Sequence, residues 1–379
     1  MRFPEFHGEW EKCKLGDIAE FSSVRVSSAK LDCKNYVSTE NMLQDFQGVV
    51  EAKSVPNETN VISFTCGDIL ISNIRPYLKK IWKATFDGGC SSDVFVLHAT
   101  DNVAKDYLHY AVANDKFISY VMSGAKGVKM PRGDKNQMRT YQLSLPSIQE
   151  QHKIAKLLTL LDERIATQSK LIEDLKKLKS AIIDYAINSL DSGFVKFGSL
   201  YEMAGEGGTP TTSKASFYDN GKIPFIKIDD LKKKYLTENK DFITELGLQK
   251  SSAWLVPTRS ILFSNGATIG EITITTYPVC TKQGILGIVP KPNIDVEFLY
   301  YFMSSSYFKK AVSRIVTEGT MKTAYLKDIN NIRCPIPIKE KQQDIAKMPS
   351  ALNSKIDFEQ SILKLFCSQK QYLLRQMFM

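Results

Sequence analysis

The sequence contains few of the residues that build metal sites, disulfide frameworks and most hydrolytic centres. Only four of its 379 residues are histidine, and none stands in a His-Glu-x-x-His pair. Its seven cysteines are scattered and include no Cys-x-x-Cys motif. We therefore expect reduced cysteines that serve as packing residues, with no zinc site and no disulfide framework.

Motifs that hold nucleotides or methylate bases are also missing. No Gly-x-x-x-x-Gly-Lys-Ser/Thr loop is present, no Gly-x-Gly-x-x-Gly follows a strand, and no Asn/Asp-Pro-Pro-Tyr/Phe tetrapeptide occurs. The loop Gly207–Pro210 could hold a phosphate through backbone N–H groups, but a plain turn explains it equally well. We therefore expect a chain that binds no cofactor and catalyses no reaction.

The sequence also lacks membrane and secretion signals. No apolar run approaches the 18 or so residues that a membrane-spanning helix needs. The first residues, MRFPEFHGEWEK, lack the apolar centre of a signal peptide. Hydrophobic residues make up 43% and charged residues 24%, as in folded domains, and 379 residues can form two or three of them. The sequence therefore predicts a folded cytoplasmic protein.

One long helix is predicted between residues 146 and 190. Pro146 can precede a helix but cannot continue one, and about forty residues without glycine or proline follow it. Apolar residues recur there at heptad spacing on two tracks, which favours a coiled-coil helix. At about 1.5 Å per residue it would be roughly 60 Å long, so it is suited to act as a spacer.

A second copy of this helix is predicted over residues 336–379. A shift of 191 residues places Pro337 on Pro146 and Gln342 on Gln151, which indicates a duplicated unit. Because the first helix leads away from the first globular segment and the second is its equivalent, we expect them to run antiparallel and to seal each other along one seam. The predicted seam residues are Leu158, Leu161, Ile165, Ile172, Leu175, Ile182, Leu352, Ile356, Leu363, Phe366 and Leu373.

The two segments outside the helices, residues 1–145 and 191–335, mix strands and helices in the same order. Runs such as ILIS at 69–72 and ILFS at 261–264 are typical of strands, and DYLHYAV at 106–112 is typical of a helix. We therefore expect an α+β fold of two similar mixed α/β domains, separated by two long antiparallel coiled-coil helices in a pseudo-twofold arrangement.

Local motifs occur in a characteristic order along the chain. They are ILISNIRPYLKKI at 69–81, LPSIQEQHKIAKLL at 145–158, GGTPTTSKASFYDNGKIPFIKIDDL at 207–231, ILFSNGATIGEITI at 261–274 and GTMKTAYLKDINNIRCPIPIKEKQQDIA at 319–346. Together with the alternation of globular segments and long helices, they resemble the specificity subunit of type I restriction-modification enzymes over essentially the whole chain. There are three departures. The first segment lacks a Gly-Gly-Thr-Pro loop, Ser72–Pro76 replaces the Gly-rich turn seen at Ser264–Gly270, and Lys341 stands where the first copy has Glu150.

The resemblance implies a non-catalytic DNA-binding subunit of a restriction system. Each globular domain would be a target-recognition domain that reads half of a bipartite, asymmetric site in double-stranded DNA. The helices would set the distance between the half-sites and dock methylation subunits, two in number, through which motor-nuclease subunits join. An additional apolar column on the first helix, which includes Leu171 and Leu178, leaves the helix pair with surface to cover.

Candidate DNA contacts follow from side-chain type and loop position. The basic segment SGAKGVKMPRGDKNQMR at 123–139 is suited to phosphates, although a solvated charged loop is an equally good interpretation. Predicted phosphate contacts are Lys79, Lys80, Lys126, Lys129, Arg132, Lys135, Arg139, Lys214, Lys282 and Lys322. Predicted base contacts are Asn73, Arg75, Asn136, Gln137, Thr211, Ser213, Asn265 and Gln283.

Two other interpretations remain at this point. The chain could be a scaffold whose coiled rod spaces two protein-binding modules without nucleic acid, or a methyltransferase or nuclease with divergent motifs. Salt-sensitive binding of duplex DNA separates the first from a DNA reader, because phosphate contacts weaken steeply with salt. Binding of S-adenosylmethionine or cleavage by the isolated chain would favour the second.

Overall fold

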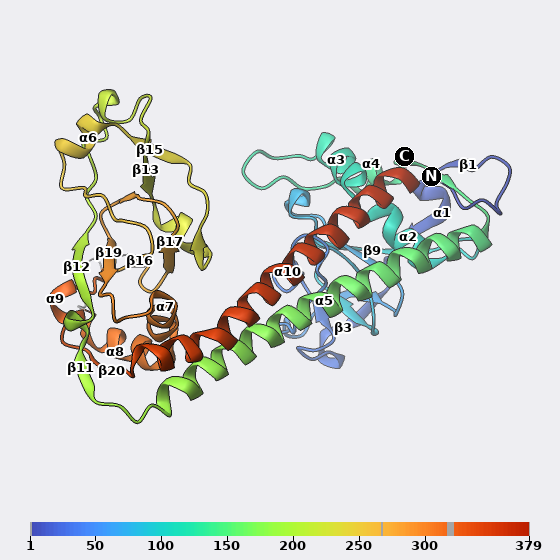
Figure 1. Ribbon diagram of the computed structural model, residues 1–379. Helices are drawn as coiled ribbons and strands as arrows, with labels where there is room; N and C mark the ends of the chain where they lie inside the picture. Colours follow the sequence, from blue (N-terminus) through green and yellow to red (C-terminus); the bar gives the residue numbers. More distant parts are fainter. Residues whose placement is uncertain (1, 267, 317–321, 379) are drawn as a thin grey trace. The chain divides into compact units, whose positions relative to one another are not determined.

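The computed structural model describes residues 2–266, 268–316 and 322–378. Residues 267 and 319–321, which belong to two of the motifs above, lie outside these ranges. The chain forms two compact units, unit 1 from residues 1–169 and 362–379 and unit 2 from residues 170–361 (Figure 1). Each unit therefore contains one globular segment and a part of each long helix.

Unit 1 contains two four-stranded sheets. One has the order β2-β9-β6-β7 and is antiparallel throughout. Its strands are β2 (Ala19–Phe21), β9 (Val94–Ala99), β6 (Ile69–Ser72) and β7 (Ile81–Lys83). The other has the order β3-β5-β8-β4, with β4 parallel to β8. Its strands are β3 (Arg25–Ser27), β5 (Asn60–Phe64), β8 (Gly88–Cys90) and β4 (Tyr36–Val37).

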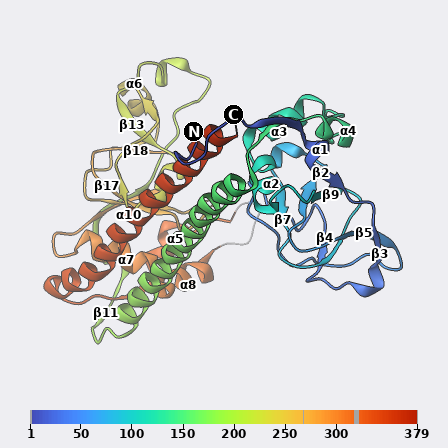
Figure 2. The same ribbon diagram turned by 90° about the vertical axis from the view of Figure 1, so that its right-hand side faces the viewer.

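Short helices complete the globular part of unit 1. They are α1 (Leu15–Ile18), α2 (Lys105–Val112), α3 (Asp115–Ser123) and α4 (Lys135–Arg139). Figure 2 shows α1, α3 and α4 at one end of this unit and β3, β4 and β5 at the other. All four residues of β6 are buried, because β6 lies between β9 and β7 and both of its faces are covered. The run ILIS therefore forms a strand, as predicted, and the structure places this strand inside the sheet.

Unit 2 has a five-stranded and a three-stranded sheet. The larger has the order β12-β19-β16-β17-β14. Its strands are β12 (Tyr201–Glu206), β19 (Ile285–Pro290), β16 (Ile261–Ser264), β17 (Ile272–Thr275) and β14 (Tyr235–Leu236). The smaller has the order β15-β13-β18, with strands β15 (Asp241–Ile243), β13 (Ile223–Ile226) and β18 (Cys280–Thr281). The helices are α6 (Glu245–Gln249), α7 (Val296–Ser304), α8 (Ser306–Ile315) and α9 (Leu326–Ile329).

In each unit a two-stranded ribbon joins the two ends of the globular segment. In unit 1, β1 (Glu11–Lys14) pairs antiparallel with β10 (Gln142–Leu145), so that Cys13 faces Leu143. In unit 2, β11 (Phe194–Lys196) pairs antiparallel with β20 (Arg333–Pro335). The globular segments therefore begin and end side by side, next to the start of the long helix that follows each of them.

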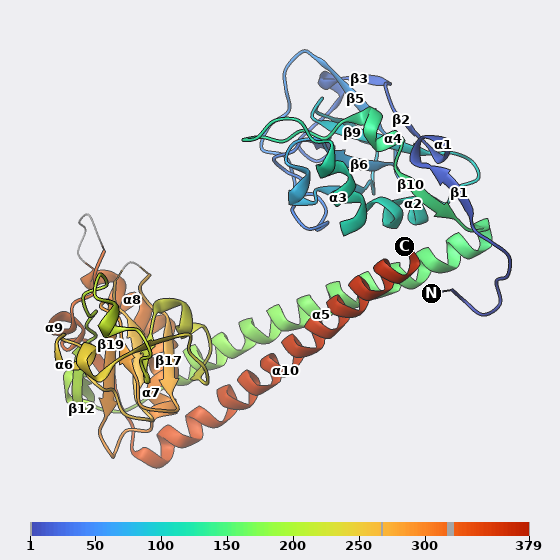
Figure 3. The same ribbon diagram turned by 90° about the horizontal axis from the view of Figure 1, so that it is seen from above.

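The long helices are α5 (Ile148–Asn188) and α10 (Lys339–Met377). In unit 1, the start of α5 packs against the end of α10, and Lys370 forms an ion pair with Asp162 at 2.5 Å. In unit 2, the end of α5 packs against the start of α10, and Lys179 donates to Asn353 at 3.0 Å. The helices are thus antiparallel within each unit, and the predicted mixed fold class is confirmed (Figure 3).

The seam residues are all removed from solvent at least in part. In unit 1, Leu158 and Leu373 are buried, whereas Leu161, Ile165, Leu363 and Phe366 are partly buried. In unit 2, Ile172 and Ile356 are buried, whereas Leu175, Ile182 and Leu352 are partly buried. Leu171 and Leu178, from the additional apolar column, are exposed. Within the described ranges, no helix combines the length and the apolarity that crossing a membrane requires.

Candidate nucleic-acid interface

A buried glutamine near the start of each long helix ties that helix to its globular segment. In unit 1, Oε1 of Gln151 accepts from the N–H of Ala104 at 2.9 Å, and its Nε2 donates to the carbonyls of Asn102 at 3.3 Å and Pro146 at 2.9 Å. The amide thus joins the loop before α2 to the end of β10. Because its polar groups are paired, this buried side chain fixes where the helix leaves the globular part.

Gln342 repeats this arrangement in unit 2. Its Oε1 accepts from the N–H of Asp295 at 2.8 Å, and its Nε2 donates to the carbonyls of Asn293 at 3.3 Å and Pro337 at 2.8 Å. Each of its partners lies 191 residues after the corresponding partner of Gln151. The sequence repeat therefore extends to individual hydrogen bonds. The pairing of the two glutamines was visible in the sequence, but their role was not predicted.

A tyrosine on the helix after the loop makes a second tie in each unit. In unit 1, the hydroxyls of Tyr110 and Thr159 lie 3.3 Å apart, and Tyr110 also donates to Asp162 at 2.8 Å. In unit 2, Tyr301 donates to Ser350 at 3.1 Å. The glutamine and tyrosine hydrogen bonds together hold each globular part against its long helix. The loops of each globular part are therefore carried on a body that is fixed to the helix.

The basic segment of unit 1 forms a hairpin between α3 and α4, which projects from the globular part (Figure 1). Lys126 and Arg132 exchange two backbone hydrogen bonds, of 3.0 and 2.9 Å. The hairpin is anchored on the loop after β6, because the N–H of Arg75 donates to Pro131 at 2.7 Å and the N–H of Gly133 donates to Asn73 at 2.8 Å. These hydrogen bonds fix the base of the hairpin on the globular part.

Asp134 ends the hairpin and caps α4. Its carboxylate accepts from the backbone N–H groups of Asn136 at 2.8 Å and Gln137 at 3.1 Å. These hydrogen bonds, together with the side-chain contact to Lys126, hold the pKa of Asp134 below its usual range. The carboxylate therefore stays ionised within a cluster of cations and fixes the orientation of α4.

The predicted phosphate contacts of unit 1 fall into two groups. Lys129 is exposed and makes no ion pair or hydrogen bond among the described residues. Lys126 forms an ion pair with Asp134 at 3.3 Å, and Arg132 forms one with Asp93 at 3.1 Å. The two cations are exposed to solvent. Lys135 and Arg139 lie over the ring of Phe21, at 4.9 and 5.6 Å from its centroid. These five cations all lie within residues 126–139, and all of them except the partly buried Lys135 are exposed.

Lys79 and Lys80 are engaged elsewhere. Lys79 forms an ion pair with Asp115 at 2.8 Å. Lys80 donates to the carbonyl of Thr39 at 2.6 Å, and burial, followed by the charge of Arg75, lowers the pKa of its ammonium. Both lysines therefore have partners within unit 1, unlike Lys129. Sequence alone gave no sign of this difference, because Asp115 and Thr39 are distant in the chain.

Asn73 and Asn265, predicted to contact bases, are buried at equivalent positions after β6 and β16. The carbonyl of Asn73 accepts from Gly133, and that of Asn265 accepts from Ala324 at 2.9 Å. Both side-chain Oδ1 atoms are buried and have no hydrogen-bond partner among the described residues. The backbone carbonyls of these two asparagines therefore hold neighbouring loops in place, and neither Oδ1 atom is presented at the surface.

The other predicted base contacts of unit 1 differ in accessibility. Arg75 is exposed and has a left-handed backbone conformation, with φ of 50°, which directs the chain out of the sheet. Asn136 is exposed on the first turn of α4. The side chain of Gln137, in contrast, donates to the carbonyl of Tyr120 at 2.6 Å. Arg75 and Asn136 are therefore available to a ligand in this conformation, whereas Gln137 is engaged within the unit.

The candidates of unit 2 lie on exposed loops. Thr211, Ser213, Lys214, Lys282, Gln283 and Lys322 are all exposed. Lys214 lies over the ring of Phe217 at 5.3 Å, and the N–H of Gln283 donates to Thr209 at 3.3 Å, so the Gly-Gly-Thr-Pro loop and the loop after β18 are joined. These exposed side chains belong to loops that also pack on one another.

The glycines of the Gly-Gly-Thr-Pro loop are required for packing. A Cβ on Gly207 would lie 2.2 Å from the hydroxyl of Thr281, and one on Gly208 would lie 2.3 Å from the backbone nitrogen of Ala253. The N–H of Gly207 already donates to Ile285 at 2.8 Å. The loop is therefore a close-packed turn, and the N–H of Gly207 is not free to bind a phosphate.

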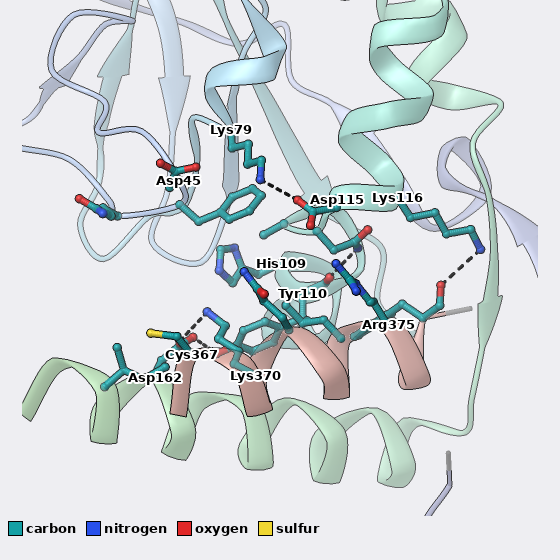
Figure 4. A pocket seen from close by; sticks show the side chains of 18 of the residues that line it. Asp45, Lys79, His109, Tyr110, Asp115, Lys116, Asp162, Cys367, Lys370 and Arg375 are labelled. Atoms are coloured by element: carbon teal, nitrogen blue, oxygen red, sulfur yellow. Dashed lines mark hydrogen bonds and ion pairs between the residues drawn. The ribbon is translucent and has the colours of Figure 1, made fainter. Parts of the chain in front are cut away.

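A cavity of about 900 Å³ lies in unit 1 between the globular part and the helices α5 and α10 (Figure 4). Four of the charged side chains that line the cavity form two ion pairs, Lys79–Asp115 and Lys370–Asp162. Burial, followed by the charge of Lys370, lowers the pKa of His109 to about 4, so this ring is neutral at pH 7. Nδ1 of His109 has no hydrogen-bond partner among the described residues.

Two further ionisable side chains line the cavity, Tyr110 and Cys367. Tyr110 donates its hydroxyl to Asp162, and burial raises the pKa of this hydroxyl, so it stays protonated. The thiol of Cys367 lines the cavity but is exposed. Within the described ranges, no group of three or more His, Cys, Asp or Glu side chains could hold a metal ion.

Comparisons with known proteins agree with this architecture. A family model described as "Type I restriction modification DNA specificity domain" matches twice, over residues 7–177 and 190–365. The type I restriction enzyme MjaVIII specificity subunit of Methanocaldococcus jannaschii is 23% identical over an alignment of 399 residues, which covers 94% of this chain and 90% of the relative.

Two solved structures share the fold over nearly their whole length. The type I restriction-modification system S subunit from M. genitalium has a TM-score of 0.59 at 16% identity, covering 100% of this chain and 99% of that chain. A chain from the structure described as "Structural basis underlying complex assembly and conformational transition of the type I R-M system" has a TM-score of 0.62 at 16% identity, covering 98% of each chain. At these identities the likeness concerns the fold.

Proposed function

Because the chain belongs to the family of type I restriction-modification specificity subunits, we propose that it is the non-catalytic, sequence-reading subunit of such a complex. It binds a bipartite, asymmetric site in double-stranded DNA in the cytoplasm, and each globular domain reads one half-site. The observation that carries this proposal is the duplicated plan of the two units, whose tying hydrogen bonds recur at a spacing of 191 residues while their exposed loops differ.

Base recognition and phosphate binding are divided between different side chains in this proposal. In unit 1, the exposed cations of residues 126–139 contact phosphates, which set the register on the duplex, and Arg75 and Asn136 contact base edges. In unit 2, Lys214, Lys282 and Lys322 contact phosphates, and Thr211, Ser213 and Gln283 contact bases. Asn73 and Asn265 hold neighbouring loops in place through the hydrogen bonds that their backbone carbonyls accept.

The long helices serve as spacer and docking surface. A helix of 41 residues is about 60 Å long, which is comparable to the distance between separated half-sites on a duplex. Both helices leave large apolar side chains in solvent, among them Leu171 and Leu178 on α5 and Phe358 and Leu365 on α10. Such side chains are suited to bury against helices of methylation subunits, two per complex, through which motor-nuclease subunits join.

A domain exchange tests the assignment of the globular domains. Residues 1–145 are replaced by the corresponding segment of another family member, and the chain is expressed with its methylation subunits. Sequencing of methylated adenines should then report a site in which one half has changed and the other is retained. Retention of the original half-site in full would contradict the assignment of residues 1–145 as a reader.

Duplex binding separates this function from a scaffold without nucleic acid. Affinity of the complex for duplex DNA should fall steeply between about 50 and 200 mM salt, because bound phosphates release counterions. Lack of any salt-sensitive duplex binding would favour the scaffold. Removal of residues 336–379 should abolish assembly with the methylation subunits, because it deletes one of the two helices.

A further inference from the structure

The hairpin of residues 126–132 presents an apolar tip. Val128 is fully exposed, at 103%, and Met130 is 47% exposed. Gly127, whose φ of +95° favours glycine, precedes the bend at residues 128–130, and Lys126 pairs with Arg132 on the other arm of the hairpin. Because Val128 buries no surface in the described part of the chain, it does not contribute to the core of unit 1.

The base of the hairpin is fixed, although its tip is free. Backbone hydrogen bonds join Pro131 to Arg75 and Gly133 to Asn73, at 2.7 and 2.8 Å. Side-chain contacts add Arg132 to Asp93 and Lys126 to Asp134, at 3.1 and 3.3 Å. An apolar side chain on such a support is held away from the body of the protein at a defined position.

Cations surround this apolar tip. Lys126 and Lys129 lie next to it in the chain, and Arg132 follows on the return arm, whereas Asp134 is engaged in capping α4. A tip of this kind matches a surface with apolar groups between two rows of negative charge. The groove of a DNA duplex has that character, because base edges with methyl groups lie between the phosphates of the two strands.

We propose that the hairpin tip enters a groove of the DNA, where Val128 and Met130 make apolar contact with base edges while Lys126, Lys129 and Arg132 contact the flanking phosphates. Val128 is then a specificity-determining residue of the first half-site. Apolar side chains read thymine methyl groups in the major groove and widen base steps in the minor groove, and both contacts need a projecting, supported residue. This inference rests on the proposed function.

The test compares Val128→Thr with Val50→Thr in the full chain, assembled with its methylation subunits. Threonine keeps the shape of valine and replaces one of its two methyl groups by a hydroxyl. Val50 is also exposed in unit 1, at 51%, but lies outside the hairpin, so its variant is the matched control. One probe is a DNA duplex that carries the sequence at which the complex methylates DNA. The other probes are duplexes that each differ from it by one changed base pair in the first half-site.

Val128→Thr should lower affinity for the intact site by about tenfold, the equivalent of one base contact, with little change for an unrelated duplex. The variant should no longer distinguish the correct base pair from changed ones at one or two adjacent positions of the first half-site. Its discrimination between base pairs in the second half-site should be unchanged. Val50→Thr should bind as the unchanged chain does. Thermal unfolding checks that both variants fold, which full exposure of Val128 leads us to expect.

Two results would overturn the inference. One is a Val128→Thr variant that discriminates every position as well as the unchanged chain does. The other is equal weakening on the intact site and on unrelated duplexes, since that indicates a contact with the DNA backbone. Failure of the unchanged chain to bind any duplex in a salt-sensitive manner would instead contradict the proposed function, so the two failures are distinguishable.

Discussion

Gln151 and Gln342, 191 residues apart, bind their respective units through the same three hydrogen bonds. Each amide accepts one backbone N–H and donates to two carbonyls, and each is 1% exposed. A side chain that is buried and fully engaged in this way is costly to replace by an apolar one. The duplication has thus kept the attachment of helix to globular part while the loops diverged.

Replacement of Gln342 by leucine should destabilise unit 2. The N–H of Asp295 and the carbonyl of Pro337 lose their buried partner, which costs about 1–3 kcal/mol for each unsatisfied group. Chemical unfolding of the full chain measures the loss, and Gln360→Leu, at an exposed position of α10, is the control. Equal stability of the two variants would mean that the three hydrogen bonds contribute nothing net.

Lys234 is a buried cation of unit 2, and its loss should be partly rescued by a second change. Its side chain is 2% exposed and lies 2.6 Å from Glu297, which is 26% exposed, and 2.9 Å from Ser350. Lys234→Met should cost about 3 kcal/mol, because Glu297 keeps a charge without its cation. The double variant with Glu297→Gln should unfold at higher denaturant concentration than Lys234→Met alone. A double variant less stable than Lys234→Met would argue against charge imbalance as the cause.

Glu297 adds a pH dependence to the same contact. Its burial acts to raise its pKa, but hydrogen bonds from Lys234, Ser350 and Tyr235 outweigh it, and the pKa lies below its usual range. The carboxylate therefore stabilises unit 2 above the pKa of an unfolded glutamate, about 4.3, and this contribution is lost as the pH falls through its folded pKa. Glu297→Gln should flatten the unfolding curve against pH in this acidic range only.

His109 should make the full chain less stable in mildly acidic solution. Its folded pKa is about 4, whereas that of an unfolded histidine is about 6.5, so the unfolded chain takes up the proton first. Stability should therefore fall as the pH decreases from about 6.5 towards 4, with no contribution from this ring above that range. Urea midpoints between pH 7.5 and 5 measure the effect, and His109→Gln should reduce the slope. Identical slopes in the two proteins would contradict the assigned pKa.

Lys129 should contribute to DNA affinity without contributing to sequence choice, if the proposed function holds. It is exposed and makes no ion pair within the described ranges, so its ammonium is available to a phosphate. Lys129→Gln should weaken binding to intact and unrelated duplexes equally and reduce the salt slope by about 0.9. Lys156→Gln, an exposed position on α5, is the control. A loss confined to the intact site would assign Lys129 to base recognition instead.

The long helices and the duplication could be predicted because their signals are local or repetitive. Pro146 and Pro337 precede the helices, and heptad spacing gives the buried face that includes Leu158 and Ile356. Prediction was also good for strands such as β6, whose three apolar residues and Ser72 are all buried. In each case the residues that determine the structure are neighbours in the sequence.

The surface of the candidate site could not be predicted in the same detail, because burial of a loop residue depends on distant segments. Asn73 follows a strand and is typical of a base-reading residue, yet the hairpin around Gly133 covers it. Phe21, which supports Lys135 and Arg139, lies more than a hundred residues before them. No periodicity or motif records such contacts, since they arise only when the whole unit has folded.

The two-stranded ribbons β1–β10 and β11–β20 have an evolutionary consequence. Each ribbon pairs the first strand of a globular segment with its last strand. The chain therefore enters and leaves each globular segment at the same place. Genetic recombination at the two ends of a ribbon would transplant a complete globular segment and leave the long helix that follows it in place. If each globular segment reads one half-site, as proposed, a new recognition sequence can arise in a single exchange of this kind, without gradual mutation of a working interface.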